Sequence, residues 1–330
     1  MDQIIIEYSA ILISVFVLSA VILRFLIPVL KSKKVGQKIL EIGPRWHKTK
    51  EGTPTMGGVA FIIAILVSVC VLSVISLIMG NSEQLLPLAF TLGLATINGL
   101  IGFIDDRCKL LKKENEGLKA YQKFALQVIA AAIYLFAMSR IGFVDTKLHI
   151  PFTDIYWDMG WIYYALAMII IVGIVNGVNL TDGVDGLASG VTGVVGIFFG
   201  VVAITDQHRS LAIASASTVG AALGFLVYNF NPARVFMGDT GSLFFGGMVV
   251  GCAFMINEPL IIAFCGIIYI FEILSVMIQV GVYKLTRKRV FKMAPIHHHF
   301  EKSGWNERVI FAVFTTVTAL GCVIAWLSIC

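Results

Sequence analysis

Two short stretches of this sequence place carboxylates where a metal ion and a phosphate could be held. Asp105 and Asp106 are adjacent in GLIGFIDD, and Asp239 lies in the glycine-rich stretch NPARVFMGDTGS. Neighbouring carboxylates repel each other unless a cation lies between them, and Mg²⁺ is commonly bound by one or two carboxylates together with phosphate oxygens. We therefore predict that these three aspartates form a metal site acting on a phosphorylated substrate. The alternative is that the adjacent pair only neutralises Arg107 and Lys109.

The stretch NLTDGVDGLA adds Asn179, Asp182 and Asp185 at intervals of three residues. This spacing predicts that the three side chains share one broad face of a helical turn. Gly183 lies between the two aspartates and lets the backbone approach a ligand closely. A helix end with a capping aspartate explains part of this pattern but not all of it, so we predict a pocket for phosphates or a nucleoside.

The stretch NFNPARVFMGDTGS combines an amide, an aromatic ring and a carboxylate. Phe236 offers a stacking face for a base, or belongs to the core, and Asn229 precedes it. Asp239 could also cap a helix that begins here. Capping and a functional role are compatible, because the N-terminus of a helix also favours a bound anion.

Three successive histidines, His297, His298 and His299, occur in MAPIHHHFE. Successive side chains point in different directions, so this run alone is a poor zinc site. Histidine changes its charge near neutral pH. We therefore expect one or two of the three to bind phosphate or relay protons, and the others to hold the loop.

Two further polar features flank apolar runs. KEGTPTMGG places Lys50 and Thr55 where a cation and a hydroxyl could meet a phosphorylated ligand, although a flexible basic loop would look the same. Glu272 and Gln279 lie seven residues apart, and so on one helix face, inside an apolar run. Polar side chains in lipid need partners. We expect Gln279 to line the site and Glu272 to make a structural hydrogen bond.

The elements that must position these residues are membrane helices. Of the 330 residues 58% are hydrophobic and 14% charged, whereas soluble domains have about 25% charged residues. A soluble enzyme, a nucleic-acid binder and a disordered regulator are therefore excluded. A bilayer span needs about 20 apolar residues. Ten runs qualify as helices, at 4–30, 57–79, 85–104, 121–140, 161–178, 186–204, 210–228, 241–257, 259–283 and 309–330.

The cations orient these ten spans. With ten crossings, 21 of the 25 Lys and Arg residues fall on one side, mainly in the loops 31–56, 105–123 and 284–308. By the positive-inside rule this side is cytoplasmic, and both termini face outward. The aromatic segment 141–160 is partly alternating, which indicates a small extracytoplasmic β-hairpin. We therefore predict an all-α integral membrane protein with its acidic motifs on the cytoplasmic face.

Five motifs stand in order along the chain: PTMGG, GLIGFIDD, NLTDGVDGLA, NPARVFMGDTGS and MAPIHHHFE. Together they resemble the polyprenyl-phosphate N-acetylhexosamine-1-phosphate transferase superfamily. The last motif is similar to that of the phospho-N-acetylmuramoyl-pentapeptide transferase family. The motifs span residues 50–301, and the ten-span plan covers the whole chain as one polytopic domain, residues 1–330. Its active-site loops would be 31–56, 105–120, 179–186, 229–240 and 284–308.

The resemblance implies a reaction and its partners. UDP-MurNAc-pentapeptide and undecaprenyl phosphate would give lipid I and UMP, the first membrane step of peptidoglycan biosynthesis, with Mg²⁺ as cofactor. It implies the bacterial inner membrane as the location and nucleoside antibiotics as ligands, and it leaves a homodimer open. No nucleic-acid partner is expected. Alternatives are a sister transferase that moves N-acetylglucosamine-1-phosphate and, from another class, an ion-coupled transporter.

The same resemblance assigns roles to matching positions. Asp105, Asp106 and Asp239 would be catalytic and hold the metal, and His298 is a further catalytic candidate. Asp105 would contact the lipid phosphate. A one-step attack and a covalent intermediate on Asp239 both stay open. The remaining residues would bind substrate: Lys50, Thr55, Lys109, Lys119, Lys123, Asn179, Asp182, Gly183, Asp185, Asn229, Phe236, Gln279, His297 and His299.

Overall fold

The computed structural model describes residues 2–33, 52–78, 85–112 and 117–329, and most of them are helical. The long helices are α1 (Asp2–Ser32), α2 (Gly58–Ile78), α3 (Leu86–Lys112), α4 (Ala120–Arg140), α5 (Ile162–Thr181), α6 (Leu187–Thr205), α7 (Arg209–Asn229), α8 (Gly238–Met255), α10 (Ile267–Thr286) and α12 (Glu307–Ile329). These ten are long and apolar enough to cross a membrane. The prediction of ten spans in an all-α membrane protein is confirmed.

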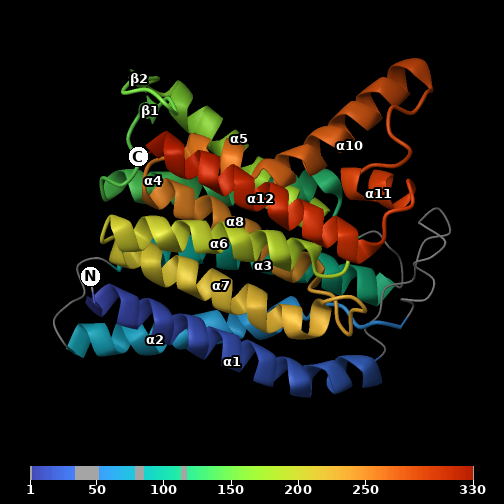
Figure 1. The fold of residues 1–330 in the computed structure, drawn as a ribbon, viewed down its shortest axis with the longest axis horizontal. Coiled ribbons are helices and arrows are strands. Elements are labelled where there is room, and N and C mark those ends of the chain that lie inside the picture. The colour runs from blue at the N-terminus through green and yellow to red at the C-terminus, as the bar shows by residue number, and fades with distance from the viewer. Residues whose placement is uncertain (1, 34–51, 79–84, 113–116, 330) are drawn as a thin grey trace.

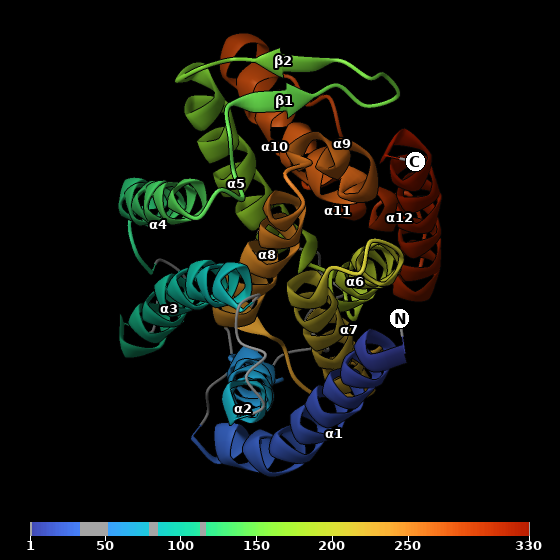
Figure 2. The ribbon, with the colours of Figure 1, turned by 90° about the vertical axis from the view of Figure 1, so that its left-hand side faces the viewer.

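Helix α8 lies at the centre of the bundle, between α3 and α5 (Figure 2). Nearly all of its membrane-length window is buried, whereas most of α1 and α10 faces outward. Glycines allow the close contact on both sides: Gly246 packs on the backbone of Val175 in α5, and Gly247 packs on the backbone of Ala95 in α3. The middle of α8 is therefore packed closely between two neighbouring helices.

The two ends of the bundle differ in what they carry (Figure 1). One end holds both chain termini and the antiparallel strands β1 (Lys147–His149) and β2 (Tyr156–Asp158), and we call it the hairpin end. The opposite end carries the short helix α11 (Ile296–Glu301), and we call it the α11 end. The predicted hairpin within 141–160 and the placement of both termini on one side are confirmed.

The ninth apolar run is not one continuous helix. Its first part forms the 3₁₀ turn η2 (Pro259–Ile261) and the short helix α9 (Ile262–Cys265), and α10 begins only after Gly266. The break lets α10 diverge from the bundle toward the α11 end (Figure 1). Glu272 and Gln279 both remain on α10, as predicted.

Candidate active site

The three predicted metal-binding aspartates lie together at the α11 end. Asp105 and Asp106 are in the last turns of α3, and Asp239 is in the first turn of α8. One oxygen from each lies within 4.8 Å of the other two. The closeness depends on Gly102, one turn before the aspartate pair. A Cβ there would overlap the backbone carbonyl of Asp239, so the two helices could not approach this far.

Asp239 is the most heavily engaged of the three. Its Oδ2 accepts hydrogen bonds from the ammonium groups of Lys109 at 3.0 Å and Lys123 at 2.9 Å. Its Oδ1 accepts one from the amide of Asn179 at 2.9 Å, and that amide also donates to Ser242 at 2.8 Å. Charge-assisted bonds of this kind are the strong ones. Asp239 is thereby fixed between α3, α4 and α5.

Asp105 is buried and binds within its own segment. Its Oδ2 lies 2.7 Å from Lys109 Nζ, and its Oδ1 accepts the backbone N–H of Leu118 at 2.7 Å. Part of the alternative interpretation is therefore correct, because Asp105 does pair with Lys109. Within the described residues, three carboxylates meet only two lysine side chains, Lys109 and Lys123. The cluster keeps an excess of negative charge, which suits an additional cation.

Asp106 has a structural task that its position in the sequence did not reveal. Its carboxylate accepts the backbone N–H groups of Asp239 at 3.2 Å and Thr240 at 2.9 Å, and the Thr240 hydroxyl at 2.7 Å. It therefore caps α8 from another helix, by satisfying amides that no intrahelical carbonyl can reach. The prediction that Asp239 caps this helix is wrong: its side chain faces the lysines instead.

Gly238 makes this arrangement possible. Its φ is +72°, a conformation that disfavours other residues. A Cβ there would lie 2.6 Å from Asp106 Oδ2 and 3.0 Å from the Thr55 hydroxyl. Thr55 itself is buried against this turn. The PTMGG motif runs beside it, because Phe236 exchanges backbone hydrogen bonds with Pro54 and Gly57, each of 2.8 Å.

The helical turn predicted for Asn179, Asp182 and Asp185 is wrong. Helix α5 ends at Thr181, and residues 182–186 form turns before α6 begins. Asn179, near the end of α5, donates a hydrogen bond to the acidic cluster. Asp185 turns the other way and accepts the backbone N–H of Ala233 at 2.8 Å. Gly183 lets the backbone approach a ligand, but glycine also disfavours a helix. Here the second property prevails, and α5 ends before Asp182.

Asn229 and Phe236 lie beside this turn in different ways. Asn229 is buried, and it accepts the N–H of Gly186 at 3.1 Å and donates to the carbonyl of Val235 at 2.9 Å. Both the oxygen and the amide of the Asn229 side chain are thus bound to backbone groups. Phe236 is half-buried and keeps part of its ring accessible.

The three histidines occupy three different environments, as expected for successive residues. His297 is fully buried, with Nδ1 3.1 Å from the carboxylate of Glu272, and Gly183 packs on the opposite side of its ring. His298 is half-buried, with Nδ1 2.5 Å from Glu301. His299 accepts the backbone N–H of Lys292 at 3.1 Å. The structural hydrogen bond expected for Glu272 is not found among the described residues: its carboxylate lies close to His297, but the geometry of this contact is not that of a hydrogen bond.

The remaining predicted binding residues are more peripheral. The side-chain oxygen of Gln279 accepts the N–H groups of Val290 at 3.1 Å and Phe291 at 2.9 Å, so it holds the loop after α10. Lys119 is exposed at the start of α4. Lys50 lies outside the described residues.

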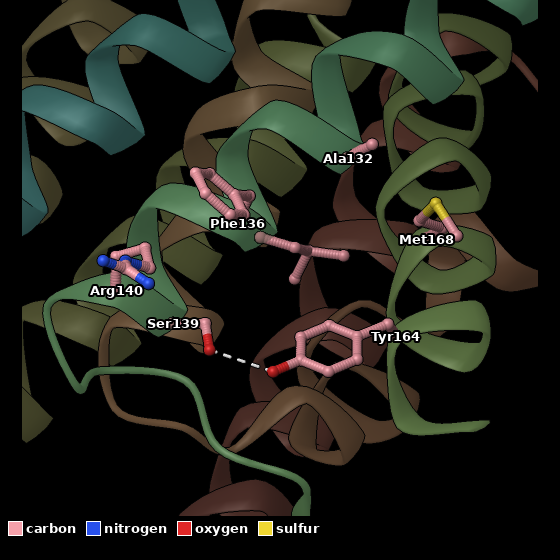
Figure 3. Close-up of a pocket in the computed structure, with 7 residues that line it drawn as sticks. Ala132, Phe136, Ser139, Arg140, Tyr164 and Met168 are labelled. Atoms are coloured by element: carbon pink, nitrogen blue, oxygen red, sulfur yellow. Dashed lines mark hydrogen bonds between the residues drawn. The ribbon is translucent and has the colours of Figure 1, made fainter. Parts of the chain in front are cut away.

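A cavity of about 420 Å³ between α4 and α5 is separate from this site (Figure 3). It is mostly apolar and lies in the half of the bundle nearer the hairpin end, where Ser139 and Tyr164 share a hydrogen bond of 2.9 Å. Lys123, by contrast, lies near the other end of α4. The cavity therefore does not contribute to the acidic cluster.

Fold and site together define a multi-pass membrane protein with a buried acidic cluster at one end of its helices. Residues 87–257 match the family model described as glycosyl transferase family 4. Residues 50–62 match phospho-N-acetylmuramoyl-pentapeptide-transferase signature 1. The class is therefore that of the membrane transferases, and the chain is an enzyme.

Relatives of known name identify the family within this class of membrane transferases. Proteins named phospho-N-acetylmuramoyl-pentapeptide-transferase from Clostridium novyi and Clostridioides difficile are each 46% identical over 95% of this chain and 94% of the relative. One from Caldicellulosiruptor bescii is 42% identical over 96% of this chain and 95% of the relative. This chain belongs to the phospho-N-acetylmuramoyl-pentapeptide-transferase family.

Proposed function

We propose that this enzyme transfers phospho-MurNAc-pentapeptide from UDP-MurNAc-pentapeptide to undecaprenyl phosphate, giving lipid I and UMP. The observation that carries the proposal is the cluster of Asp105, Asp106 and Asp239 with Lys109 and Lys123 at one end of a membrane bundle. A lipid phosphate and a water-soluble nucleotide sugar can meet only near a membrane surface. Phosphoryl transfer needs mainly positioning and neutralisation of charge.

The donor set fits Mg²⁺, which prefers carboxylate and phosphate oxygens. Asp105 and Asp239 would hold the ion, with Asp106 beside them fixing the first turn of α8. When bound, the ion supplies positive charge to the pyrophosphate of the donor substrate. Lys109 and Lys123 each contact Asp239 and would bind the phosphate oxygens that come to lie beside it.

We propose a direct attack rather than a covalent intermediate, because a single step needs no nucleophile from the protein. Asp239 then serves to hold the ion and to position Lys109 and Lys123, which both donate to its Oδ2. In the direct step an oxygen of the lipid phosphate forms a bond to the sugar-linked phosphorus. The bond from that phosphorus to the bridging oxygen breaks, and UMP leaves with the electron pair.

The chain would act as one domain in the cytoplasmic membrane of a bacterium, with the α11 end facing the cytoplasm. The described cations support this orientation, because Lys109, Lys123 and Arg308 lie at the α11 end and the positive-inside rule places such residues in the cytoplasm. Dimer formation and binding of nucleoside antibiotics stay predictions from the family resemblance.

The decisive experiment measures UMP release by the purified, detergent-solubilised protein. We expect release only when UDP-MurNAc-pentapeptide, undecaprenyl phosphate and Mg²⁺ are all present. Release without the lipid phosphate would contradict the proposal. Faster release with UDP-N-acetylglucosamine would favour the sister transferase, and ion-driven uptake into vesicles without UMP release would favour a transporter.

A further inference from the structure

A second cavity lies at the α11 end, between the end of α11 and the start of α12. Its volume is about 410 Å³, within the about 300–1,000 Å³ typical of ligand pockets. It combines two carboxylates, a guanidinium, two amides and an indole. Its lining residues are Asn231, Glu301, Trp305, Asn306, Glu307 and Arg308.

Hydrogen bonds join this cavity to residues of the predicted site. Glu301 contacts His298, with 2.5 Å between Oε2 and Nδ1, and Glu307 accepts the backbone N–H of Asp185 at 3.1 Å. Asn231 donates to the carboxylate of Asp185 at 3.3 Å. The cavity wall thus contacts the turn that holds Asp185 and the histidine segment, both of which carry predicted substrate-binding residues.

Arg308 is the cation among these lining residues, and most of its hydrogen-bond donors make no hydrogen bond to the described protein groups. Its side chain is exposed, and within the described part of the chain it donates one hydrogen bond, of 3.5 Å, to the carbonyl of Asn231. A guanidinium can bind a carboxylate through two parallel hydrogen bonds. Trp305 beside it is 37% exposed and offers an apolar surface for small side chains.

We propose that this cavity binds the carboxylate-bearing end of the donor's peptide, with Arg308 pairing with the terminal carboxylate. The inference rests on the proposed function, which supplies a substrate with a peptide. Asn179, which holds Asp239, and Asp185, at the cavity, are six residues apart, so their backbones lie at most about 20 Å from each other. A peptide of five residues spans up to about 17 Å. The sugar and the peptide together can therefore bridge the distance between Asn179 and Asp185.

The test compares two donors on two proteins. The donors are UDP-MurNAc-pentapeptide and the same molecule with its terminal carboxylate converted to a carboxamide. For the wild-type enzyme we expect kcat/KM for UMP release to fall about tenfold on amidation, the scale of one lost charge-assisted hydrogen bond. Arg308→Gln should lose about the same factor on the acid donor and nothing further on the amide donor.

Lys288→Gln is the matched control, since Lys288 is an exposed cation after α10 and outside the cavity lining. It should keep the wild-type ratio between the two donors. An Arg308→Gln enzyme that still prefers the acid donor tenfold would overturn the inference, and so would a wild-type enzyme that does not distinguish the donors. If the wild-type enzyme releases no UMP from either donor, the proposed function fails as well.

Discussion

The two ends of the helix bundle both hold charged side chains within a largely apolar protein, but they balance the charges differently. At the hairpin end single acidic groups pair with single basic groups, as Glu7 does with Arg209 at 2.7 Å and Glu258 does with His149 at 2.9 Å among the described residues. At the α11 end three carboxylates share two lysines. Balanced pairs join neighbouring elements, whereas an excess of one sign is stable only with a further partner. The balanced pairs therefore stabilise the fold, whereas the unbalanced cluster is suited to bind a ligand.

The largest effect should come from removing one charge of the unbalanced cluster. Asp239→Asn leaves Lys109 and Lys123 without their shared carboxylate and removes a candidate metal ligand. We expect UMP release to fall about a thousandfold, the upper range for losing one preorganised electrostatic contact. The melting temperature in detergent should change little. Near-normal turnover would remove Asp239 from the site.

The control for this variant is Asp158→Asn at the hairpin end. Asp158 is an exposed carboxylate that accepts hydrogen bonds from Thr146 and the backbone of Gly160. We expect wild-type activity, because Asp158 lies at the opposite end of the bundle from the acidic cluster. A comparable loss in both variants would mean that the two ends do not differ in function.

A fully buried pair at the α11 end should matter more for stability than a partly buried pair at the hairpin end. Glu272→Ala leaves the imidazole of His297 buried without its carboxylate. We expect a loss of about 3 kcal/mol in the free energy of unfolding, the range for breaking a buried pair. Glu7→Ala should cost about 1 kcal/mol or less, as expected for a partly solvated pair.

Ser275→Ala controls for the α10 position itself. Its hydroxyl is buried but bonds only to the carbonyl of Glu272 in its own helix. Denaturant unfolding should show a change below about 1 kcal/mol. Equal losses for the Ser275 and Glu272 variants would indicate a general sensitivity of α10 rather than a role for the pair.

Two glycines of α3, one tightly packed and one with open space around it, give a third comparison. Gly102→Ala would force a Cβ against the Asp239 carbonyl and displace the start of α8, although neither residue's side-chain chemistry changes. We expect UMP release to fall about a hundredfold, since small displacements at a reacting centre cost this much. Gly93→Ala, nearer the hairpin end of the same helix, meets no atom within 4 Å and should leave activity unchanged. Similar activities in the two variants would contradict the prediction.

The smallest effect is the pH dependence of the hairpin end. Burial lowers the pKa of His149, but hydrogen bonds to Glu258 and to the carbonyl of Thr153 outweigh it, and the pKa is raised overall. Burial also raises the pKa of Glu258. For a raised pKa, the stabilisation is complete below the unfolded value, about 6.5 for histidine, and is lost as the pH rises through the folded value.

The difference in melting temperature between wild type and His149→Gln should therefore be largest near pH 6 and shrink toward pH 8. A thermal melt across this range measures it directly. UMP release by the two proteins should be equal at each pH, because His149 lies at the hairpin end. A difference that grows with pH would mean that the sign of the linkage is wrong.

The membrane architecture was predictable because bilayer spans need long apolar runs, which are visible along the chain without any tertiary information. All ten spans were predicted in this way, and the hairpin was predicted from the alternating pattern of residues 141–160. The break at Gly266 was not, because an apolar run looks the same whether one helix or two cross it. The aspartates of the cluster were also identified, since carboxylates are scarce in so apolar a chain.

The roles of individual residues were less accessible, because spacing along the chain does not tell which way a side chain turns. Asp106 and Asp105 are neighbours, yet one caps α8 and the other binds Lys109. Asp185 leaves the cluster because α5 ends before it. Glu301, Glu307 and Arg308 lie in the predicted active-site loop 284–308 but were not named as site residues, because the sequence does not show that Asn231 folds beside them to form a cavity.

The sequence by itself determined that the chain crosses a membrane ten times and carries its acidic motifs toward one end, because hydrophobicity and charge act locally. Only the tertiary structure decided which carboxylates meet. The unequal count of three carboxylates and two lysines arises from the approach of α3, α4 and α8, which Gly102 permits. Charge balance is a property of groups close in space, so it could be read only once the helices were packed.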